Sequence, residues 1–191
     1  MEVMGIVGWS GSGKTSLLVA LLPILKERGL KVSTMKHAHH RFDLDHPGKD
    51  SFRHRQAGAS EVLVVTSSRW VLLHESREEA EPAIEELIER MTQVDLLLIE
   101  GFKTHAHPKL EIHRHSEGKP LLAPDDPGIV AIATDQPLPG VAVAQLDLND
   151  PESIADFILV HTGLDQRFPR PGVQFGSGRP RIGSRPWRQT T

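Results

Sequence analysis

The strongest constraint on this chain is a glycine-rich loop near its N-terminus. Residues 8–15 match the phosphate-binding pattern G-x-x-x-x-G-K-[ST]. A short β-rich run, residues 3–7, precedes the loop, and leucines follow it at helical spacing, at positions 17, 18, 21, 22 and 25. A strand, a phosphate loop and a helix in this order predict that the chain binds a nucleotide.

The residue types in the loop suit a triphosphate. Glycines allow the backbone conformations that point several N–H groups at one place, and the following helix N-terminus adds partial positive charge. We expect Lys14 to reach the β- and γ-phosphates as a catalytic residue, and the Thr15 hydroxyl to bind Mg²⁺. The loop residues predicted to bind the nucleotide are Ser10, Gly11, Ser12, Gly13, Lys14, Thr15 and Ser16.

Strand and helix patterns alternate after the loop. Further strands are expected at residues 31–35, 61–66, 70–73, 94–99, 129–133 and 141–146, and further helices at 79–91 and 150–160. Residues 94–99 are almost continuously apolar, which is typical of a strand covered on both faces. The pattern predicts an α/β fold, a three-layer sandwich around a mainly parallel sheet, of the P-loop NTPase type.

Composition divides the chain in two. Residues 1–164 are expected to form the nucleotide-binding domain, and residues 165–191, rich in Arg, Pro and Gly, a flexible C-terminal tail. The chain has a net charge of −3 and the six arginines after residue 165 contribute +6, which leaves −9 for the remainder. So acidic a domain argues against nucleic acid as a partner.

Other classes of protein are also disfavoured. The chain has no cysteine, which excludes disulfides and thiolate catalysis. It has neither an apolar run long enough to span a bilayer nor a signal-like N-terminus, so no membrane partner is expected. We expect a cytoplasmic location.

An acidic residue of the site is expected at the carboxyl end of a strand, because parallel α/β sheets bind ligands there. Asp95 and Glu100 lie about 16 Å apart along one strand, and only Glu100 falls at the carboxyl end. Glu100 is therefore predicted to act in catalysis and to hold Mg²⁺ or orient a water. Alternatively, it caps the strand or pairs with Lys103.

The same rule selects Lys36, His37 and Asp135. A carboxylate at Asp135 could accept hydrogen bonds from both N1–H and the 2-amino group of guanine, which adenine cannot donate. The full Asn-Lys-x-Asp signature of guanine readers is absent, so a plain turn residue is the alternative.

A polar stretch, residues 37–51, is long enough to be functional. Its part from Pro47 to Ser51 resembles a second small anion loop, with Ser51 capping a short helix. A solvated turn is the alternative. The residues expected to face a substrate or partner are Lys36, His37, Asp43, Asp45, Lys49, Asp50 and Ser51.

Histidines suggest a competing interpretation. His37, His39 and His40 lie near Asp43 and Asp45, and two H-x-H pairs begin at His105 and His113. Such side chains can bind zinc or nickel, but alternate residues on strands also produce this spacing. Solvated histidines, or histidines facing an anionic substrate, are the alternative.

Taken together, these motifs resemble the molybdopterin-guanine dinucleotide biosynthesis protein B family. The resemblance covers roughly residues 3 to 162 and is carried by Gly8–Thr15, the Lys36-His37-x-His39-His40 stretch, Asp43–Ser51, Gly58-Ala59, Glu100–Lys103 and Ala133–Asp135. It implies a GTP-binding, often dimeric protein with weak Mg²⁺-dependent GTPase activity. It also implies a role beside the guanylyltransferase that attaches GMP to molybdopterin.

Two other functions remain open. A P-loop kinase could move the γ-phosphate onto a small acceptor, with Arg53 or Arg55 assisting. A binding module without hydrolysis could instead hold the cofactor or deliver GTP to a partner enzyme.

Overall fold

The computed structural model describes residues 1–38, 44–77, 80–103 and 105–171. The chain divides into two units, one comprising Met1–His37 and Gln93–Thr191 and the other comprising Ala38–Thr92.

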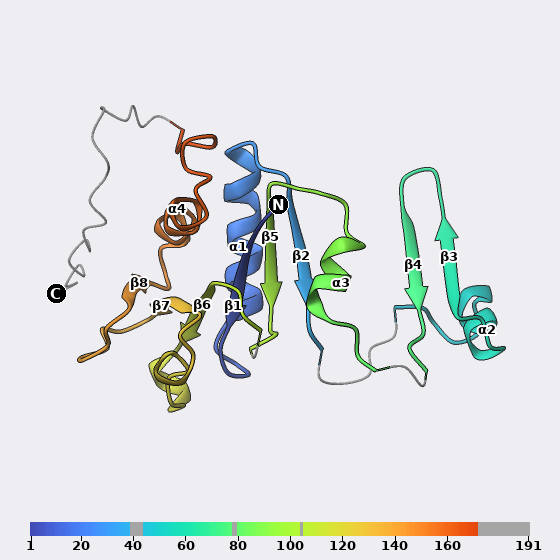
Figure 1. Ribbon diagram of the computed structural model, residues 1–191, viewed down its shortest axis with the longest axis horizontal. Coiled ribbons are helices and arrows are strands. Elements are labelled where there is room, and N and C mark those ends of the chain that lie inside the picture. Colours follow the sequence, from blue (N-terminus) through green and yellow to red (C-terminus); the bar gives the residue numbers. More distant parts are fainter. Residues whose placement is uncertain (39–43, 78–79, 104, 172–191) are drawn as a thin grey trace. The chain divides into compact units, whose positions relative to one another are not determined.

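The first unit contains a six-stranded sheet whose neighbouring strands are all parallel. Its order is β2-β5-β1-β6-β7-β8 (Figure 1). The strands are β1 (Glu2–Val7), β2 (Val32–Lys36), β5 (Leu96–Glu100), β6 (Lys109–His113), β7 (Ile129–Thr134) and β8 (Ala144–Asp147). This confirms the predicted α/β fold with a mainly parallel sheet.

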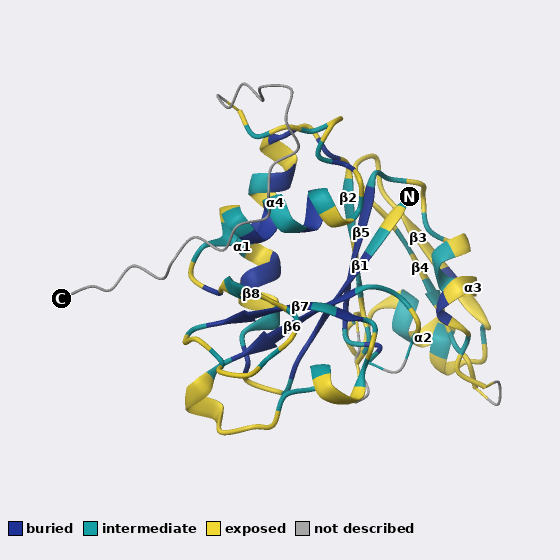
Figure 2. Ribbon diagram, turned by 60° about the vertical axis from the view of Figure 1, so that its left-hand side comes forward, coloured by how far each residue is buried: buried dark blue, intermediate teal, exposed yellow. Residues whose placement is uncertain are grey.

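Helices α1 (Lys14–Glu27) and α4 (Pro151–His161) pack against each other in this unit. The apolar stripe of α1 is buried, as its leucine spacing predicted. Helix α4 begins where the Asp150 side chain accepts a hydrogen bond from the Ser153 N–H, with Pro151 at the first helical position. Figure 2 shows the buried residues concentrated in the strands and along these two helices.

A smaller apolar cluster lies on strands β1 and β7. It contains Val7, Ile129 and Ile132 and is covered by the connecting segments, including Leu122 and Val143. The 3₁₀ helices η1 (His115–Glu117) and η2 (Ala123–Asp125) belong to these connections. Strand β8 therefore begins at Ala144, later than the predicted residue 141, because the chain before it packs on this cluster.

The second unit contains α2 (Asp50–Gln56), the antiparallel hairpin of β3 (Glu61–Val65) and β4 (Trp70–His74), and α3 (Ile84–Glu89). Helix α2 packs against β3. None of the helices in the described ranges of the chain is long and apolar enough to cross a membrane.

Two helix starts differ from the prediction. Helix α3 begins at Ile84, not at residue 79, because Ala83 is extended and Pro82 lacks the N–H that a helix interior needs. Helix α2 begins at Asp50 with Lys49 as its N-cap, so Ser51 lies inside the helix and does not cap it.

Strand β6 was not predicted. Lys109, Glu111 and His113 alternate with apolar residues, a pattern typical of a half-exposed strand, yet all five residues of β6 are buried. The Lys109 amine has carbonyl oxygens and a carboxylate as partners, and the Glu111 carboxylate accepts from backbone N–H groups. These partners offset the cost of burying the two charges.

The start of the predicted tail packs on the first unit. Phe168 lies against the main core, and Arg170 Nη2 lies 2.8 Å from Asp156 Oδ2 on α4. The domain therefore extends past the predicted boundary at residue 164, because this segment supplies one ring to the core and one cation to α4. Residues 172–191 lie outside the described residues.

Candidate nucleotide-binding site

The phosphate loop connects β1 to α1, as the sequence predicted. Gly13 caps α1 in the left-handed region with φ 96°, and Gly8 has φ 148°. A Cβ at Gly8 would lie 2.5 Å from the carbonyl oxygen of Ile112, so this position requires glycine for space as well as for conformation. The first turn of α1 contains no acidic residue, which leaves its positive end available to an anion.

Two side chains of the loop have different environments. The Ser12 side chain turns inward: the residue is 2% exposed, and its hydroxyl has no hydrogen-bond partner among the described residues. Ser12 N donates to Trp9 O at 3.3 Å, within the loop. Ser10 is exposed.

Lys14 lies folded along the loop. Its amine donates hydrogen bonds to the carbonyl oxygens of Gly8 at 3.2 Å and Trp9 at 2.9 Å. Burial lowers the pKa of Lys14 below its usual value of 10.5; Glu100 opposes this shift, whereas the cations of Lys103 and Lys36 add to it. Lys103, Lys36 and the Glu100 carboxylate therefore all act on the Lys14 amine.

Thr15 and Glu100 meet at the start of α1. The Thr15 hydroxyl donates to the Glu100 carboxylate, with Oγ1 3.0 Å from Oε1 and 3.1 Å from Oε2. Lys36 Nζ lies 3.1 Å from Oε1. The strand register explains this contact, because Glu100 pairs with Lys36 on β2 and with Ile6 on β1. A hydroxyl and a carboxylate this close are the oxygen donors that Mg²⁺ prefers, so these residues fit that ion.

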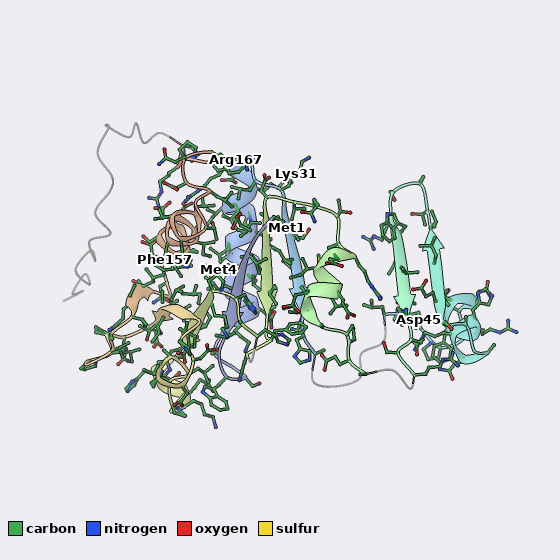
Figure 3. All side chains as sticks on the ribbon, in the orientation of Figure 1. Met1, Met4, Lys31, Asp45, Phe157 and Arg167 are labelled. Carbon is green, nitrogen blue, oxygen red and sulfur yellow. The ribbon has the colours of Figure 1, made fainter. Side chains whose placement is uncertain are left out.

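Asp95 lies at the opposite end of β5. Its carboxylate accepts from the Lys31 N–H at 2.9 Å and lies 3.2 Å from Nη2 of Arg167. Figure 3 shows Lys31 and Arg167 at this same end of the sheet. Of the two acids, Glu100 therefore lies beside the phosphate loop, and its predicted role toward Mg²⁺ or water stays a prediction.

The chain turns sharply after Glu100. Gly101 has φ 99°, and Phe102 adopts φ 50°, a left-handed conformation that is uncommon outside glycine. The Phe102 ring stacks on His37 with centroids 4.4 Å apart and meets the edge of His105 at 5.0 Å. The His37 N–H also donates to Glu100 O at 2.9 Å. The predicted residue His37 therefore lies beside the site, in an aromatic cluster.

The buried amine of Lys109 holds this turn. It donates to the carbonyl oxygens of Lys103 at 2.9 Å and His105 at 2.7 Å, and lies 2.7 Å from Asp126 Oδ2. The carboxylate of Glu111, on the same strand, accepts from the N–H groups of Leu122 and Ala123 at 2.7 and 2.9 Å. Strand β6 thus anchors the connections on both sides of it.

Two further cations lie near the loop: Lys103, which the sequence suggested only as a partner of Glu100, and Arg114, which it did not suggest. Lys103 Nζ lies 4.5 Å from the Trp9 ring centroid, and the Trp9 indole N–H donates to Pro120 O at 2.7 Å. Arg114 follows β6 directly, and its guanidinium lies against Gly13. The strand-end rule would have selected Arg114 if β6 had been recognised, because Arg114 follows the carboxyl end of that strand.

Asp135 follows the carboxyl end of β7, as expected. Its Oδ1 accepts from the His115 N–H at 2.9 Å, and its Oδ2 lies 3.9 Å from Nη1 of Arg114. One carboxylate oxygen is thus engaged by the η1 segment. Base recognition by Asp135 stays a prediction.

The other residues predicted to face a substrate belong to the second unit. Arg55 pairs with Asp45 at 2.8 Å and with Glu75 at 2.9 Å, which links α2 to the segments on either side. Lys49, Asp50 and Ser51 form the start of α2. Asp43 lies outside the described residues, and a substrate-binding role for this stretch stays a prediction.

The histidine-rich segments form no metal cluster in the described part of the chain. No group of three or more His, Cys, Asp or Glu side chains that could hold a metal ion is found there. His39 and His40 of the first segment lie outside the described residues.

Comparisons with known proteins agree on one family. The family model of molybdopterin guanine dinucleotide synthesis protein B (MobB) matches residues 3–135. A molybdopterin-guanine dinucleotide biosynthesis adapter protein from Escherichia coli (strain K12) is 41% identical over 162 residues, covering 83% of this chain and 92% of the relative. One of the same name from Haemophilus influenzae is 40% identical over 160 residues, with 83% and 88% covered.

Solved structures show the same likeness. The crystal structure of a molybdopterin-guanine biosynthesis protein B superimposes with a TM-score of 0.67 at 27% identity, covering 83% of this chain and 99% of that one. The MobB protein of Bacillus subtilis superimposes with a TM-score of 0.66 at 25% identity, covering 85% and 98%.

Proposed function

The chain belongs to the molybdopterin guanine dinucleotide synthesis protein B (MobB) family, and we propose that it binds GTP with Mg²⁺ and hydrolyses it slowly. In this proposal it assists the guanylyltransferase that converts molybdopterin to its guanine dinucleotide form. Family membership supports an adapter role in molybdopterin-guanine dinucleotide biosynthesis. The nucleotide, the metal and the hydrolysis are proposed from the site.

The observation that carries the nucleotide proposal is the contact between Thr15 and Glu100 at the start of α1, beside the Lys14 amine. Backbone N–H groups and the helix N-terminus favour the phosphates, and Lys14 leaves its two carbonyl partners to reach them. Bound Mg²⁺ would neutralise the phosphate charge, with the Thr15 hydroxyl and the Glu100 carboxylate among its donors. The Glu100 carboxylate can alternatively orient a water toward the terminal phosphate.

A direct test measures affinities for GTP, ATP and GDP by calorimetry with Mg²⁺ present. We expect GTP to bind and Lys14→Ala to abolish that binding. Asp135→Ala tests base recognition, which predicts a larger loss for GTP than for ATP. Unchanged GTP affinity in Lys14→Ala would refute the assignment of the phosphate loop.

The kinase alternative gives a different product. Incubation with γ-labelled GTP and molybdopterin releases free phosphate if the protein is a GTPase, and transfers label to the acceptor if it is a kinase. The delivery alternative is tested with Glu100→Gln. It predicts that this variant keeps both pathway activity and partner binding. Our proposal predicts that the variant loses GTP hydrolysis and, with it, the ability to assist the guanylyltransferase.

We propose that the protein forms a homodimer through the β3–β4 hairpin. Leu63 pairs with Leu72 and Val65 pairs with Trp70, so these four side chains share one face of the hairpin. They are 59%, 46%, 64% and 66% exposed in that order, whereas on the other face Val62 is 7% exposed and Val64 39%.

A two-stranded hairpin is marginally stable by itself, and an apolar face of this kind marks an interaction site. A second copy presents the same face, so a two-fold pairing of hairpins would cover both at once. This surface supports the homodimer proposal.

A further inference from the structure

Arg114 holds a position on the phosphate loop that the nucleotide proposal leaves without a role. Its guanidinium lies against the backbone of Gly13: a Cβ at that glycine would be 3.3 Å from Nε and 3.4 Å from Nη2 of Arg114. Gly13 is the N-cap of α1, directly before Lys14. The guanidinium is therefore next to the point where the loop and the helix N-terminus would hold an anion.

The guanidinium of Arg114 is held loosely. Within the described ranges its nearest acidic partner is Asp135, at 3.9 Å, which is longer than a hydrogen bond, and its side chain is 36% exposed. Its N–H donors therefore face no fixed acceptor in the described structure. Arginine presents several donors in a planar fork that suits phosphate oxygens.

Asp135 fixes the backbone that carries Arg114. Its Oδ1 accepts from the N–H of His115 at 2.9 Å, one residue after Arg114. Asp135 follows β7 and Arg114 follows β6, and these neighbouring parallel strands end side by side, with His113 paired to Thr134. The carboxylate can therefore both orient the guanidinium and hold the segment that bears it.

The surrounding charges are mixed. Glu117, on the same segment, places Oε2 3.0 Å from the position of a Cβ at Gly11. An anion on the loop would be repelled by this exposed carboxylate and attracted by Lys14 and Arg114. Arg114 is a cation beside the loop that can offset the charge of Glu117.

From this geometry we infer that Arg114 is a second phosphate-binding cation beside Lys14, and that Asp135 is its positioning residue. The inference rests on the proposed nucleotide function and extends it. In this role Asp135 does not contact the base. Without Asp135, Arg114 is no longer held in place, and the binding of every nucleoside triphosphate weakens equally.

The test compares GTP and ATP affinities of Arg114→Ala, Arg114→Lys, Asp135→Ala and the double variant, by calorimetry at several salt concentrations. Loss of a charge-assisted phosphate contact should weaken GTP binding about tenfold to a hundredfold in Arg114→Ala. The salt dependence of binding should become shallower because one charge contact is lost. Arg114→Lys should recover part of the affinity.

Asp135→Ala should cause a smaller loss that is equal for GTP and ATP, and no further loss in the Arg114→Ala background. Arg167→Ala is the matched control, because Arg167 also pairs with an aspartate, Asp95, but at the opposite end of the sheet. Its GTP affinity should stay unchanged.

The outcomes separate the two proposals. If Lys14→Ala abolishes GTP binding but both Arg114 variants bind as the wild type does, the inference is overturned and the nucleotide proposal stands. If Lys14→Ala binds normally, the nucleotide proposal itself fails. A GTP-selective loss in Asp135→Ala that adds to the loss in Arg114→Ala overturns the positioning role. Thermal unfolding of each variant checks that it is folded. If Arg114→Ala does not fold, Arg114→Lys still tests the inference.

Discussion

The hydroxyl of Thr15 lies 3.0 Å from Oε1 and 3.1 Å from Oε2 of Glu100, although the two residues are 85 positions apart in the chain. The contact arises because β1 and β5 are parallel neighbours, so the residues that follow β1 and those that end β5 reach the same edge of the sheet. This pair combines a hydroxyl on the first turn of α1 with an acid on a buried strand.

Replacing either member of this pair should weaken the Mg²⁺ dependence of GTP binding. We expect Thr15→Ala and Glu100→Gln each to reduce the effect of Mg²⁺ on GTP affinity about tenfold, because each removes one oxygen donor or its charge. Calorimetry with Mg²⁺ and with a chelator measures this effect. Asp95→Asn, at the other end of β5, should behave as the wild type does; equal loss there would contradict the assignment of Glu100.

Lys14 should make nucleotide binding sensitive to alkaline pH. Burial lowers the pKa of Lys14 below 10.5, so the free protein loses this charge at a lower pH than an ordinary lysine would. The charged amine attracts phosphate, so GTP affinity should be highest below this lowered pKa and fall as pH rises through it. Affinities measured in steps from neutral to alkaline pH check the prediction.

The control for this pH dependence is Lys14→Arg, because arginine keeps its charge throughout that range. Its GTP affinity, even if weaker at neutral pH, should not decline over the same interval. A decline of the same size in Lys14→Arg would assign the pH dependence to another group.

Lys109→Met should destabilise the protein and disturb the loop that bears Lys103. The substitution leaves Asp126 without its cation and the carbonyl oxygens of Lys103 and His105 without their donor. We expect a loss of about 3 kcal/mol in the free energy of unfolding, measured by urea denaturation.

Lys103 lies over the Trp9 ring, so the fluorescence of Trp9 should also change in Lys109→Met. Lys119→Met, at an exposed position, serves as the control and should change neither quantity. A stability loss equal to that of the control would mean that the buried amine contributes nothing.

A charge on the exposed face of the hairpin should prevent dimer formation. Leu63→Glu or Trp70→Glu places a carboxylate among apolar side chains that the proposal buries between two copies. Sedimentation equilibrium should then show a monomer where the wild type is a dimer. Val19→Glu introduces the same charge at a residue that is 66% exposed on α1 and should leave the dimer intact.

The phosphate loop and its flanking elements were predictable because the signals are local. The glycines occupy positions whose backbone conformation or space excludes other residues, as at Gly8, and the leucines of α1 repeat at helical spacing. Glu100 was predictable for a related reason: a continuous apolar strand places its two flanking acids at opposite ends, and the loop selects one of them.

Strand β6 could not be predicted in this way. Its alternating polar residues suggest an exposed face, whereas the structure buries the Lys109 amine against carbonyl oxygens and Asp126, and the Glu111 carboxylate against two N–H groups. Those partners lie up to 17 residues away from Lys109, so no short sequence pattern could predict them. With β6 unrecognised, Arg114 at its end was missed as well.

The sequence by itself determined the strand–loop–helix unit, the parallel α/β fold and the acid opposite the loop, because backbone conformation and hydrophobic periodicity are local properties. Only the tertiary structure decided which side chains surround that loop. Arg114 and Asp135 come together because the neighbouring parallel strands β6 and β7 end at one edge of the sheet, whereas Lys103 lies over the Trp9 ring of the loop. These contacts depend on strand register and on partners far away in the chain.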